Sequence, residues 1–218
     1  MNDMSEKTRG PWGVLFDLDG VLLDSEGQYS VFWAAMDKEY STGVPNFADY
    51  IKGFHLTRIL KYFADEEIRQ EVLGKLLAFE RQMLFEFFPG ALDFVKQLRT
   101  AGVPMAIVTS SDKKKMQALF SQYPEFPELF DKVVTGDMVT RAKPDPDCFL
   151  MGAKQLGLDI KDCVVLEDSR NGLLAGKASG AKVVGIATTL PAEQVSALCD
   201  LMVNSVSELT VDRLIDLM

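Results

Sequence analysis

The sequence predicts an α/β fold in which a parallel β-sheet core carries an inserted, all-helical cap. Short runs that are apolar on both faces alternate with helix-like segments near the start of the chain and from residue 89 onward. Such alternation is typical of a parallel sheet with helices on both sides. Residues 27–88 instead show only helical spacing. At 218 residues, the chain is long enough for one sizeable core with a smaller insertion.

Five apolar runs are the expected strands of the core. From residue 103 onward, segments with helical periodicity separate one run from the next. We therefore expect residues 1–26 and 89–218 to form one discontinuous core with a Rossmann-like sheet. The runs are GVLFDLD (13–19), VPMAIVTS (103–110), KVVTGD (132–137), CVVLEDS (163–169) and AKVVGIAT (181–188).

The cap is expected over residues 27–88. Turn-forming residues interrupt the patterns near residues 24–27 and 88–90, which places the two crossings between core and cap there. Between these crossings, apolar side chains recur at intervals of three and four, as on one face of a helix. They include Ile59, Leu60, Tyr62, Phe63, Ile68, Val72, Leu73, Leu76, Leu77, Phe79 and Leu84.

The charge balance limits the class of partner. With 32 acidic and 23 basic residues, the net charge is −9, which disfavours binding to nucleic acid or to an anionic membrane surface. A small anionic substrate stays open, because a few lysines and a metal ion can reverse the field in one cleft. The first ten residues lack the apolar segment of a signal peptide, so we expect a cytoplasmic protein. Nothing in the sequence demands an oligomer, and we expect a monomer.

Polar side chains follow the expected strands at the points where they end. Ligands of open parallel sheets bind beyond the carboxyl ends of the strands, so these side chains are expected to converge at one edge. A loop reading RAKPDPD adds a lysine to them. The residues are Asp17 and Asp19; Thr109, Ser110 and Ser111; Lys143; and Glu167, Asp168 and Ser169.

The residue types at this edge predict a phosphoryl site. Several carboxylates gathered at one place repel one another unless a positive charge lies among them. Oxygen ligands suit Mg²⁺, whereas the motifs contain no histidine or cysteine for zinc. Lys143 supplies a second positive charge, and Thr109 and Ser110 supply hydrogen-bond donors. A carboxylate can attack phosphorus to form an aspartyl-phosphate, and a second carboxyl can act as general acid and then general base.

Four segments together resemble the motifs of the haloacid dehalogenase superfamily of phosphohydrolases, and Thr109 resembles the second of these motifs. DLDGVLLDS resembles the first motif, DxDGxxxDS, and KPDPDCF and LEDSRNGLLAG resemble the third and fourth in the form typical of members with a helical cap after the first strand. The resemblance spans residues 14–188. It implies a nucleophile at Asp17, an acid and base at Asp19, a phosphate clamp at Thr109 and Lys143, and a Mg²⁺ site formed by Asp17, the backbone carbonyl of Asp19, Glu167 and Asp168.

Within this superfamily, Asp19 favours a phosphatase. Members that cleave carbon–halogen bonds or phosphonates resemble this chain at the nucleophile but lack the acid two residues later. The β-phosphoglucomutases are more similar, through the first motif and through a cap glycine that Gly53 resembles. Asp24 resembles an aspartate of the mutases, and five residues after that aspartate the mutases carry a histidine in the linker. The corresponding residue in this chain is Tyr29. We therefore expect hydrolysis of a small phosphorylated metabolite, with sugar phosphates first, while a phosphohexomutase stays open.

The cap segment GFHLTR could contact the leaving group of the substrate. Gly53, His55 and Arg58 are the candidates, although polar residues at the start of a helix are often only solvated. In the lysine run 113–115, solvation is the expected role for most side chains, and one that faces the site could assist phosphate capture. A phosphate-accepting signalling module is the alternative from another class, but such modules are far shorter and lack a cap.

Overall fold

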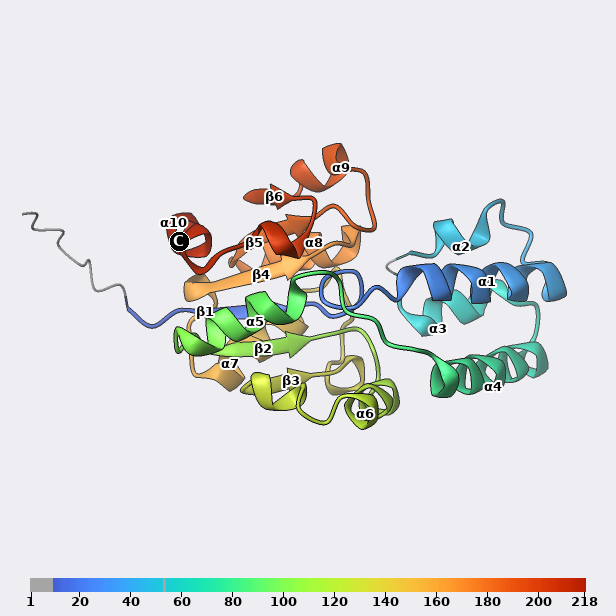
Figure 1. Cartoon of the computed structure of the whole chain (residues 1–218). Coiled ribbons are helices and arrows are strands. Elements are labelled where there is room, and N and C mark those ends of the chain that lie inside the picture. The colour runs from blue at the N-terminus through green and yellow to red at the C-terminus, as the bar shows by residue number, and fades with distance from the viewer. Residues whose placement is uncertain (1–9, 53) are drawn as a thin grey trace, which may run out of the picture.

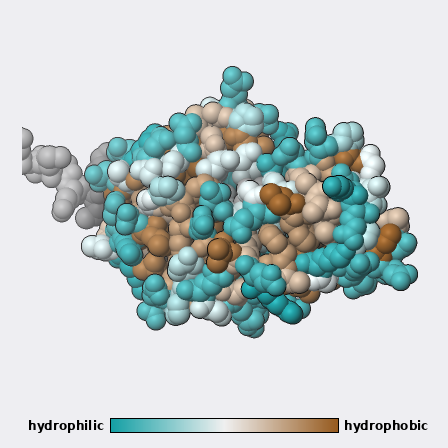
Figure 2. Space-filling view, turned by 45° about the vertical axis from the view of Figure 1, so that its right-hand side comes forward, coloured by the Kyte–Doolittle hydropathy of each residue, from teal (hydrophilic) through white to brown (hydrophobic). Residues whose placement is uncertain are grey.

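A computed structural model gives the structure of the protein over residues 10–52 and 54–218. The predicted cap contact Gly53 lies outside these described residues. The chain forms a sheet covered by helices, and a separate group of helices lies beyond the ends of the strands (Figure 1). On the face in Figure 2, hydrophilic residues cover much of the surface and strongly hydrophobic residues show as separate small patches. Among the described residues, no helix is long and apolar enough to span a membrane.

Six parallel strands make one sheet in the order β3-β2-β1-β4-β5-β6. This confirms the predicted α/β class, and the order reverses next to β1, where open α/β sheets form their ligand crevice. The sixth strand was not predicted, because it has three residues and Leu201 and Met202 are only partly buried. The strands are β1 (Gly13–Phe16), β2 (Met105–Val108), β3 (Lys132–Val134), β4 (Cys163–Glu167), β5 (Lys182–Ile186) and β6 (Leu201–Val203).

Helices cover both faces of the sheet. On β1, Val14 and Phe16 face one helical layer and Leu15 faces the other, because successive strand residues point to opposite sides. The first layer contains α5 (Ala91–Thr100), α6 (Lys113–Gln122) and α10 (Val211–Leu217). The second contains α7 (Asp147–Leu156), α8 (Arg170–Ser179) and α9 (Ala192–Ser196). Short 3₁₀ helices cover Leu60–Tyr62, Pro127–Leu129, Gly136–Met138, Ile160–Asp162 and Val206–Glu208.

The helices between β1 and α5 pack around an aromatic core of their own. Trp33, Phe47 and Phe63 are buried there, with ring centroids 5.7–6.4 Å apart in their pairs. Figure 1 shows this group beyond the arrowheads of the strands, at the carboxyl edge of the sheet. The helices are α1 (Glu26–Tyr40), α2 (Phe47–Tyr50), α3 (Leu56–Ile59) and α4 (Glu66–Gln82). We call them the cap.

The two chain crossings between core and cap run side by side. Asp24 N–H donates to the Glu86 carbonyl at 2.8 Å, and Phe88 N–H donates to the Leu22 carbonyl at 2.9 Å. Before the first crossing, the chain turns at Gly20, whose φ of +85° is a left-handed conformation that favours glycine. The paired crossings hold the cap over the end of β1.

Candidate active site

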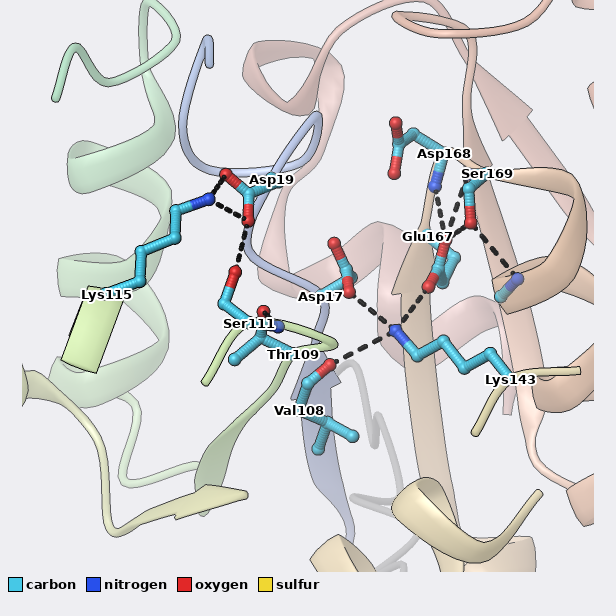
Figure 3. Close-up of polar contacts among 11 residues, drawn as sticks. Asp17, Asp19, Val108, Thr109, Ser111, Lys115, Lys143, Glu167, Asp168 and Ser169 are labelled. Carbon is cyan, nitrogen blue, oxygen red and sulfur yellow. Dashed lines mark hydrogen bonds and ion pairs between the residues drawn. The ribbon is translucent and has the colours of Figure 1, made fainter. Parts of the chain in front are cut away.

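Lys143 joins the ends of three neighbouring strands. Its Nζ donates to Asp17 Oδ1 and to Glu167 Oε1, each at 2.6 Å, and to the Val108 carbonyl at 3.3 Å (Figure 3). The ion pairs are buried, since the exposed fractions of the Lys143, Asp17 and Glu167 side chains are 6%, 10% and 1%. The backbone of Asp17 extends the sheet ladder by donating to the Leu166 carbonyl at 3.0 Å. Asp17 is thus fixed at both backbone and side chain.

The second carboxylate oxygen of Glu167 is held by the loop that starts α8. Glu167 Oε2 accepts from the backbone N–H groups of Asp168 and Ser169 at 3.0 Å and from Ser169 Oγ at 3.1 Å. Ser169 also caps α8, because its Oγ accepts from Gly172 N–H at 3.1 Å. A Cβ at Gly172 would lie 1.7 Å from Glu167 Oε1, so a larger residue there would displace this carboxylate. Both Glu167 oxygens are therefore occupied by protein groups.

Asp19 binds a different lysine and points away from Lys143 (Figure 3). Lys115 Nζ lies 2.7 Å from both Asp19 oxygens, and Ser111 Oγ donates to Oδ2 at 2.8 Å. Ser25 Oγ donates to Oδ1. Asp112 caps α6 by accepting from Lys115 N–H at 2.9 Å. This cap fixes where the helix begins, and therefore that the Lys115 side chain points toward the site.

A contact between core and cap continues from Lys115. Its Nζ lies 4.5 Å from the centroid of the Tyr29 ring on α1, as in a cation–π contact. The Tyr29 hydroxyl donates to Glu80 Oε1 on α4 at 2.9 Å. Asp19 in the core is therefore connected to two cap helices through Lys115 and Tyr29.

Thr109 and Ser110 follow β2 at the same edge. Thr109 is buried, its N–H donates to the Val134 carbonyl at 3.0 Å, and its Oγ1 accepts from Ser111 N–H at 3.0 Å. Ser110 is exposed, and both residues line the cavity between core and cap. A Cβ at Gly136 would lie 2.4 Å from the Ser110 carbonyl oxygen, so this glycine permits the close approach of the two loops.

The two aspartates differ in acidity because their surroundings differ. Burial raises the pKa of Asp17 to about 7, and Glu167 adds to this, although Lys143 opposes it. Burial acts on Asp19 in the same direction, but the ion pair and hydrogen bond with Lys115 and the hydroxyls of Ser25 and Ser111 outweigh it and lower the pKa of Asp19. The structure thus contains one carboxyl that readily takes a proton and one that is held ionised.

The carboxylates of Asp17, Glu167 and Asp168 form an acidic group. Their oxygen atoms lie within 4.8 Å of one another, and the Asp19 carboxylate is not part of the group. Three carboxylates beside one ammonium group leave a formal charge of −2, because Lys143 is the cation paired with them. Oxygen donors with this charge are compatible with a divalent cation such as Mg²⁺.

A cavity of about 420 Å³ lies between this edge and the cap. Of the predicted cap contacts, His55 lines the cavity, and its Nδ1 lies 2.9 Å from Thr57 Oγ1. Arg58 is exposed and is not among the lining residues; its guanidinium lies 3.6 Å from the centroid of the Phe54 ring. A substrate contact by His55 or Arg58 stays a prediction.

Comparison with known proteins identifies the family. A sequence profile described as haloacid dehalogenase-like hydrolase matches residues 13–180, which is most of the chain. The chain belongs to the haloacid dehalogenase-like hydrolases. The match contains the segments that carry the aspartates, Lys143 and Glu167, and the family assignment confirms the resemblance drawn from them.

Relatives of this haloacid dehalogenase-like hydrolase span nearly its whole length. Hexitol phosphatase A from Escherichia coli K12 is 31% identical over 92% of this chain and 94% of its own. A HAD hydrolase of family IA, variant 3, from Entamoeba histolytica is 26% identical with a TM-score of 0.82, covering 94% and 98% of the two chains. β-Phosphoglucomutase from Clostridium difficile shares the fold, with a TM-score of 0.79 at 19% identity over 95% and 97%.

The residues predicted at the strand ends lie together, and they include Ser111, but two other side chains that hold Asp19 were not predicted. Ser25, Ser111 and Lys115 hold Asp19, yet Ser25 was not singled out and Lys115 lay in a run expected to be mostly solvated. Tyr29 drew attention only because a histidine is missing there. The Asp112 cap could have identified Lys115, because a helix that begins at residue 113 fixes which lysine of the run faces inward.

Proposed function

We propose that this hydrolase is a Mg²⁺-dependent phosphatase that acts on a small phosphorylated metabolite of the sugar-phosphate type, with Asp17 as the nucleophile. The observation that carries the proposal is the position of Asp17 at the carboxyl end of β1, fixed by Lys143 and open to the cavity. The family assignment supports the reaction class, phosphoric monoester hydrolysis. Hexitol phosphatase A supports the substrate type.

The acidic group fits Mg²⁺ in charge and donor type. Asp17 and Asp168 would hold the ion together with the backbone carbonyl of Asp19, whereas Glu167 keeps Lys143 and the α8 loop in place with both oxygens. When bound, Mg²⁺ supplies positive charge to the phosphoryl oxygens and favours the ionised form of Asp17. Lys143, Thr109 and the Ser110 backbone supply further positive charge and hydrogen bonds to these oxygens.

The reaction then needs two carboxyl groups. Asp19 first takes up a proton from solvent, because its contact with Lys115 holds it ionised in this structure. An Asp17 oxygen then attacks phosphorus, the bond from phosphorus to the ester oxygen breaks, and Asp19 gives this proton to the departing alcohol. In the second step, Asp19 takes a proton from water, whose oxygen attacks the aspartyl-phosphate, and Asp17 and inorganic phosphate are released. Asp19 must face the ester oxygen for these transfers, and in this structure it faces Lys115.

Tyr29 favours the phosphatase over the mutase. A mutase must return the phosphoryl group to a second hydroxyl of the sugar and keep water from the aspartyl-phosphate. The linker histidine that mutases carry for coupling cap and acid is replaced here by Tyr29, which contacts Lys115 and Glu80 instead. Water rather than sugar is therefore the proposed acceptor.

The test is phosphate release from p-nitrophenyl phosphate and from a panel of sugar and polyol phosphates, with Mg²⁺ and with EDTA. We expect Mg²⁺-dependent release that is lost in Asp17→Asn. Incubation with β-glucose 1-phosphate and a bisphosphate primer separates the two activities, with free phosphate expected. Glucose 6-phosphate as the main product would show a mutase, and no release from any ester would contradict the proposed function.

A further inference from the structure

We propose that the alcohol released by this phosphatase carries an apolar or aromatic ring group that packs against the cap. The proposal rests on the proposed function, because it assigns the part of the cavity beyond the phosphoryl site to the leaving group. A sugar phosphate with an aromatic or heterocyclic substituent belongs to this class. The observation behind it is a contrast between the two walls of one cavity.

The core wall of the cavity is polar, whereas the cap wall is largely apolar. Charged and hydroxyl groups line the core wall, where the phosphoryl group would bind. On the cap wall, aliphatic and aromatic residues come from every cap helix or its flanks. They are Trp33, Ala48, Ile51, Phe54, Leu56, Ile59, Leu73, Leu76 and Leu77.

Two leucines on α4 face the cavity without joining the cap interior. Leu73 and Leu77 lie one turn apart and line the cavity, and both are partly exposed. Val72 and Leu76 on the same helix belong to the buried aromatic core, whereas Leu73 and Leu77 are in none of the hydrophobic clusters of the described residues. A group inside the cavity would remove them from water.

Three polar groups on the cap wall have partners within the protein, and Ser30 is a further polar residue of this wall. Glu80 accepts from Tyr29, Lys52 pairs with Asp49 at 3.0 Å, and His55 Nδ1 bonds Thr57. A polyol bound here would lose water from its hydroxyls and meet mainly carbon atoms, which is unfavourable. An apolar ring would lose few hydrogen bonds to water and would cover the two leucines, so the cap wall favours a ring-bearing alcohol.

The position and size of the cavity agree with this occupant. Its volume of about 420 Å³ is in the range of small-molecule pockets and exceeds the space that a phosphoryl group needs. Along α4, the residues that line the cavity change from Leu73 and Leu77 to Glu80. Glu80 is on the side of the core, because it bonds Tyr29, and the Tyr29 ring contacts Lys115 of the core. Polarity therefore increases toward Asp17, as expected for an ester with a phosphate at one end and a ring at the other.

The experiment compares esters that share one reacting centre. The first pair is glucose 6-phosphate and phenyl β-D-glucoside 6-phosphate, and the second is ribose 5-phosphate and uridine 5′-monophosphate. In the first pair, the second ester adds a phenyl ring on the anomeric oxygen, and in the second pair a uracil ring replaces the anomeric hydroxyl. We expect kcat/KM to be at least about tenfold higher for the ring-bearing ester in one or both pairs, as burial of an aromatic ring implies. Ratios below about threefold in both pairs would overturn the proposal.

Variants on the cap test whether Leu73 and Leu77 cause the preference for the ring-bearing ester. The double variant Leu73→Gln, Leu77→Gln removes the apolar contact. It should reduce the ratio of kcat/KM between the ring-bearing ester and its partner to below about threefold. Val31→Gln is the matched control, because Val31 is a 72% exposed residue on cap helix α1 that does not line the cavity. It should keep the ratio. A ratio unchanged in the double variant would assign the preference elsewhere and contradict the proposal.

Binding to Asp17→Asn separates this proposal from the proposed function. Calorimetry with this variant measures affinity for each ester without turnover, and we expect tighter binding of phenyl β-D-glucoside 6-phosphate than of glucose 6-phosphate. If no ester is hydrolysed by the unaltered enzyme, the phosphatase assignment fails. If esters are hydrolysed but the ring adds neither rate nor affinity, the phosphatase stands and the apolar-ring proposal fails.

Discussion

Lys115 Nζ lies 2.7 Å from each carboxylate oxygen of Asp19, and its opposite side faces the ring of Tyr29. The residue proposed to move protons is therefore held by a lysine of the core that also contacts the cap. Burial alone would raise the pKa of Asp19, and this ion pair reverses the direction. Lys115 is thus a positioning residue in the proposed reaction, and it acts through Asp19.

Lys115→Met should shift the pH profile of kcat. Without the ammonium group, burial raises the pKa of Asp19, so the carboxylate needed to activate water is protonated at acidic pH. We expect the acid limb to move upward and kcat near pH 5 to fall by about tenfold or more. Lys114→Met, an exposed neighbour, is the control. A profile that is the same in both variants would remove the positioning role.

Tyr29→Ala should lower kcat/KM by about tenfold, because it removes the ring that joins Lys115 to the cap. Tyr29→Phe keeps the ring and loses the bond to Glu80, so we expect a change of at most about threefold. Steady-state kinetics at one saturating Mg²⁺ concentration measures both. Equal losses in the two variants would indicate that the hydroxyl, and not the ring, connects cap and core.

Stabilisation by Mg²⁺ should increase with pH. The pKa of Asp17 is raised from 3.8 to about 7 in the folded protein, so between these pH values the folded state binds a proton that the unfolded chain has released. Without metal, the free energy of unfolding therefore falls as pH rises through this window. Mg²⁺ replaces the proton on Asp17, so the gain in Tm should be larger at pH 8 than at pH 5.5.

Thermal unfolding with Mg²⁺ and with EDTA at the two pH values measures this gain. Asp17→Asn removes the titrating carboxyl, and its smaller Mg²⁺ response should vary little with pH. A Tm gain in the unaltered protein that is equal at pH 5.5 and pH 8 would contradict competition between Mg²⁺ and a proton at Asp17.

Lys143→Met should reduce kcat by about a hundredfold or more, because it removes a positive charge beside the phosphoryl group. It also leaves two buried carboxylates without their cation, at an expected cost of about 3–5 kcal/mol in the free energy of unfolding. Arg141→Met is the control on the same loop, since its ion pairs with Asp145 and Asp147 are exposed. Urea unfolding in EDTA compares the variants, and equal effects would contradict the central role of Lys143.

Two helical glycines should respond to alanine with opposite signs. Gly172→Ala would bring a Cβ against the Glu167 carboxylate, so we expect loss of activity and stability. A Cβ at Gly74 on α4 would meet no side chain or neighbouring segment within 4 Å, and Gly74→Ala should stabilise the protein by about 0.5–1 kcal/mol. Urea unfolding measures both, and a stabilised Gly172→Ala would show that Glu167 is less constrained than its contacts indicate.

The sequence allowed the sheet edge to be predicted because its signals are local. Asp17 and Glu167 each end a buried apolar strand, and parallel strands bring such ends together. The edge strand β6 escaped prediction because only Val203 of its three residues is buried. The partners of Asp19 escaped because they depend on helix phase and on how the cap lies over the core, as the contact from Lys115 to Tyr29 shows.

The proposed reaction requires that Asp17 becomes phosphorylated during turnover. Acid quenching of the enzyme with substrate, followed by borohydride reduction, converts an aspartyl-phosphate into homoserine, which peptide mass spectrometry locates. We expect homoserine at position 17, with more of it in Asp19→Asn, where breakdown of the intermediate is slowed. Homoserine at position 19, or none at position 17 in a variant that still turns over substrate, would rule out Asp17 as the nucleophile.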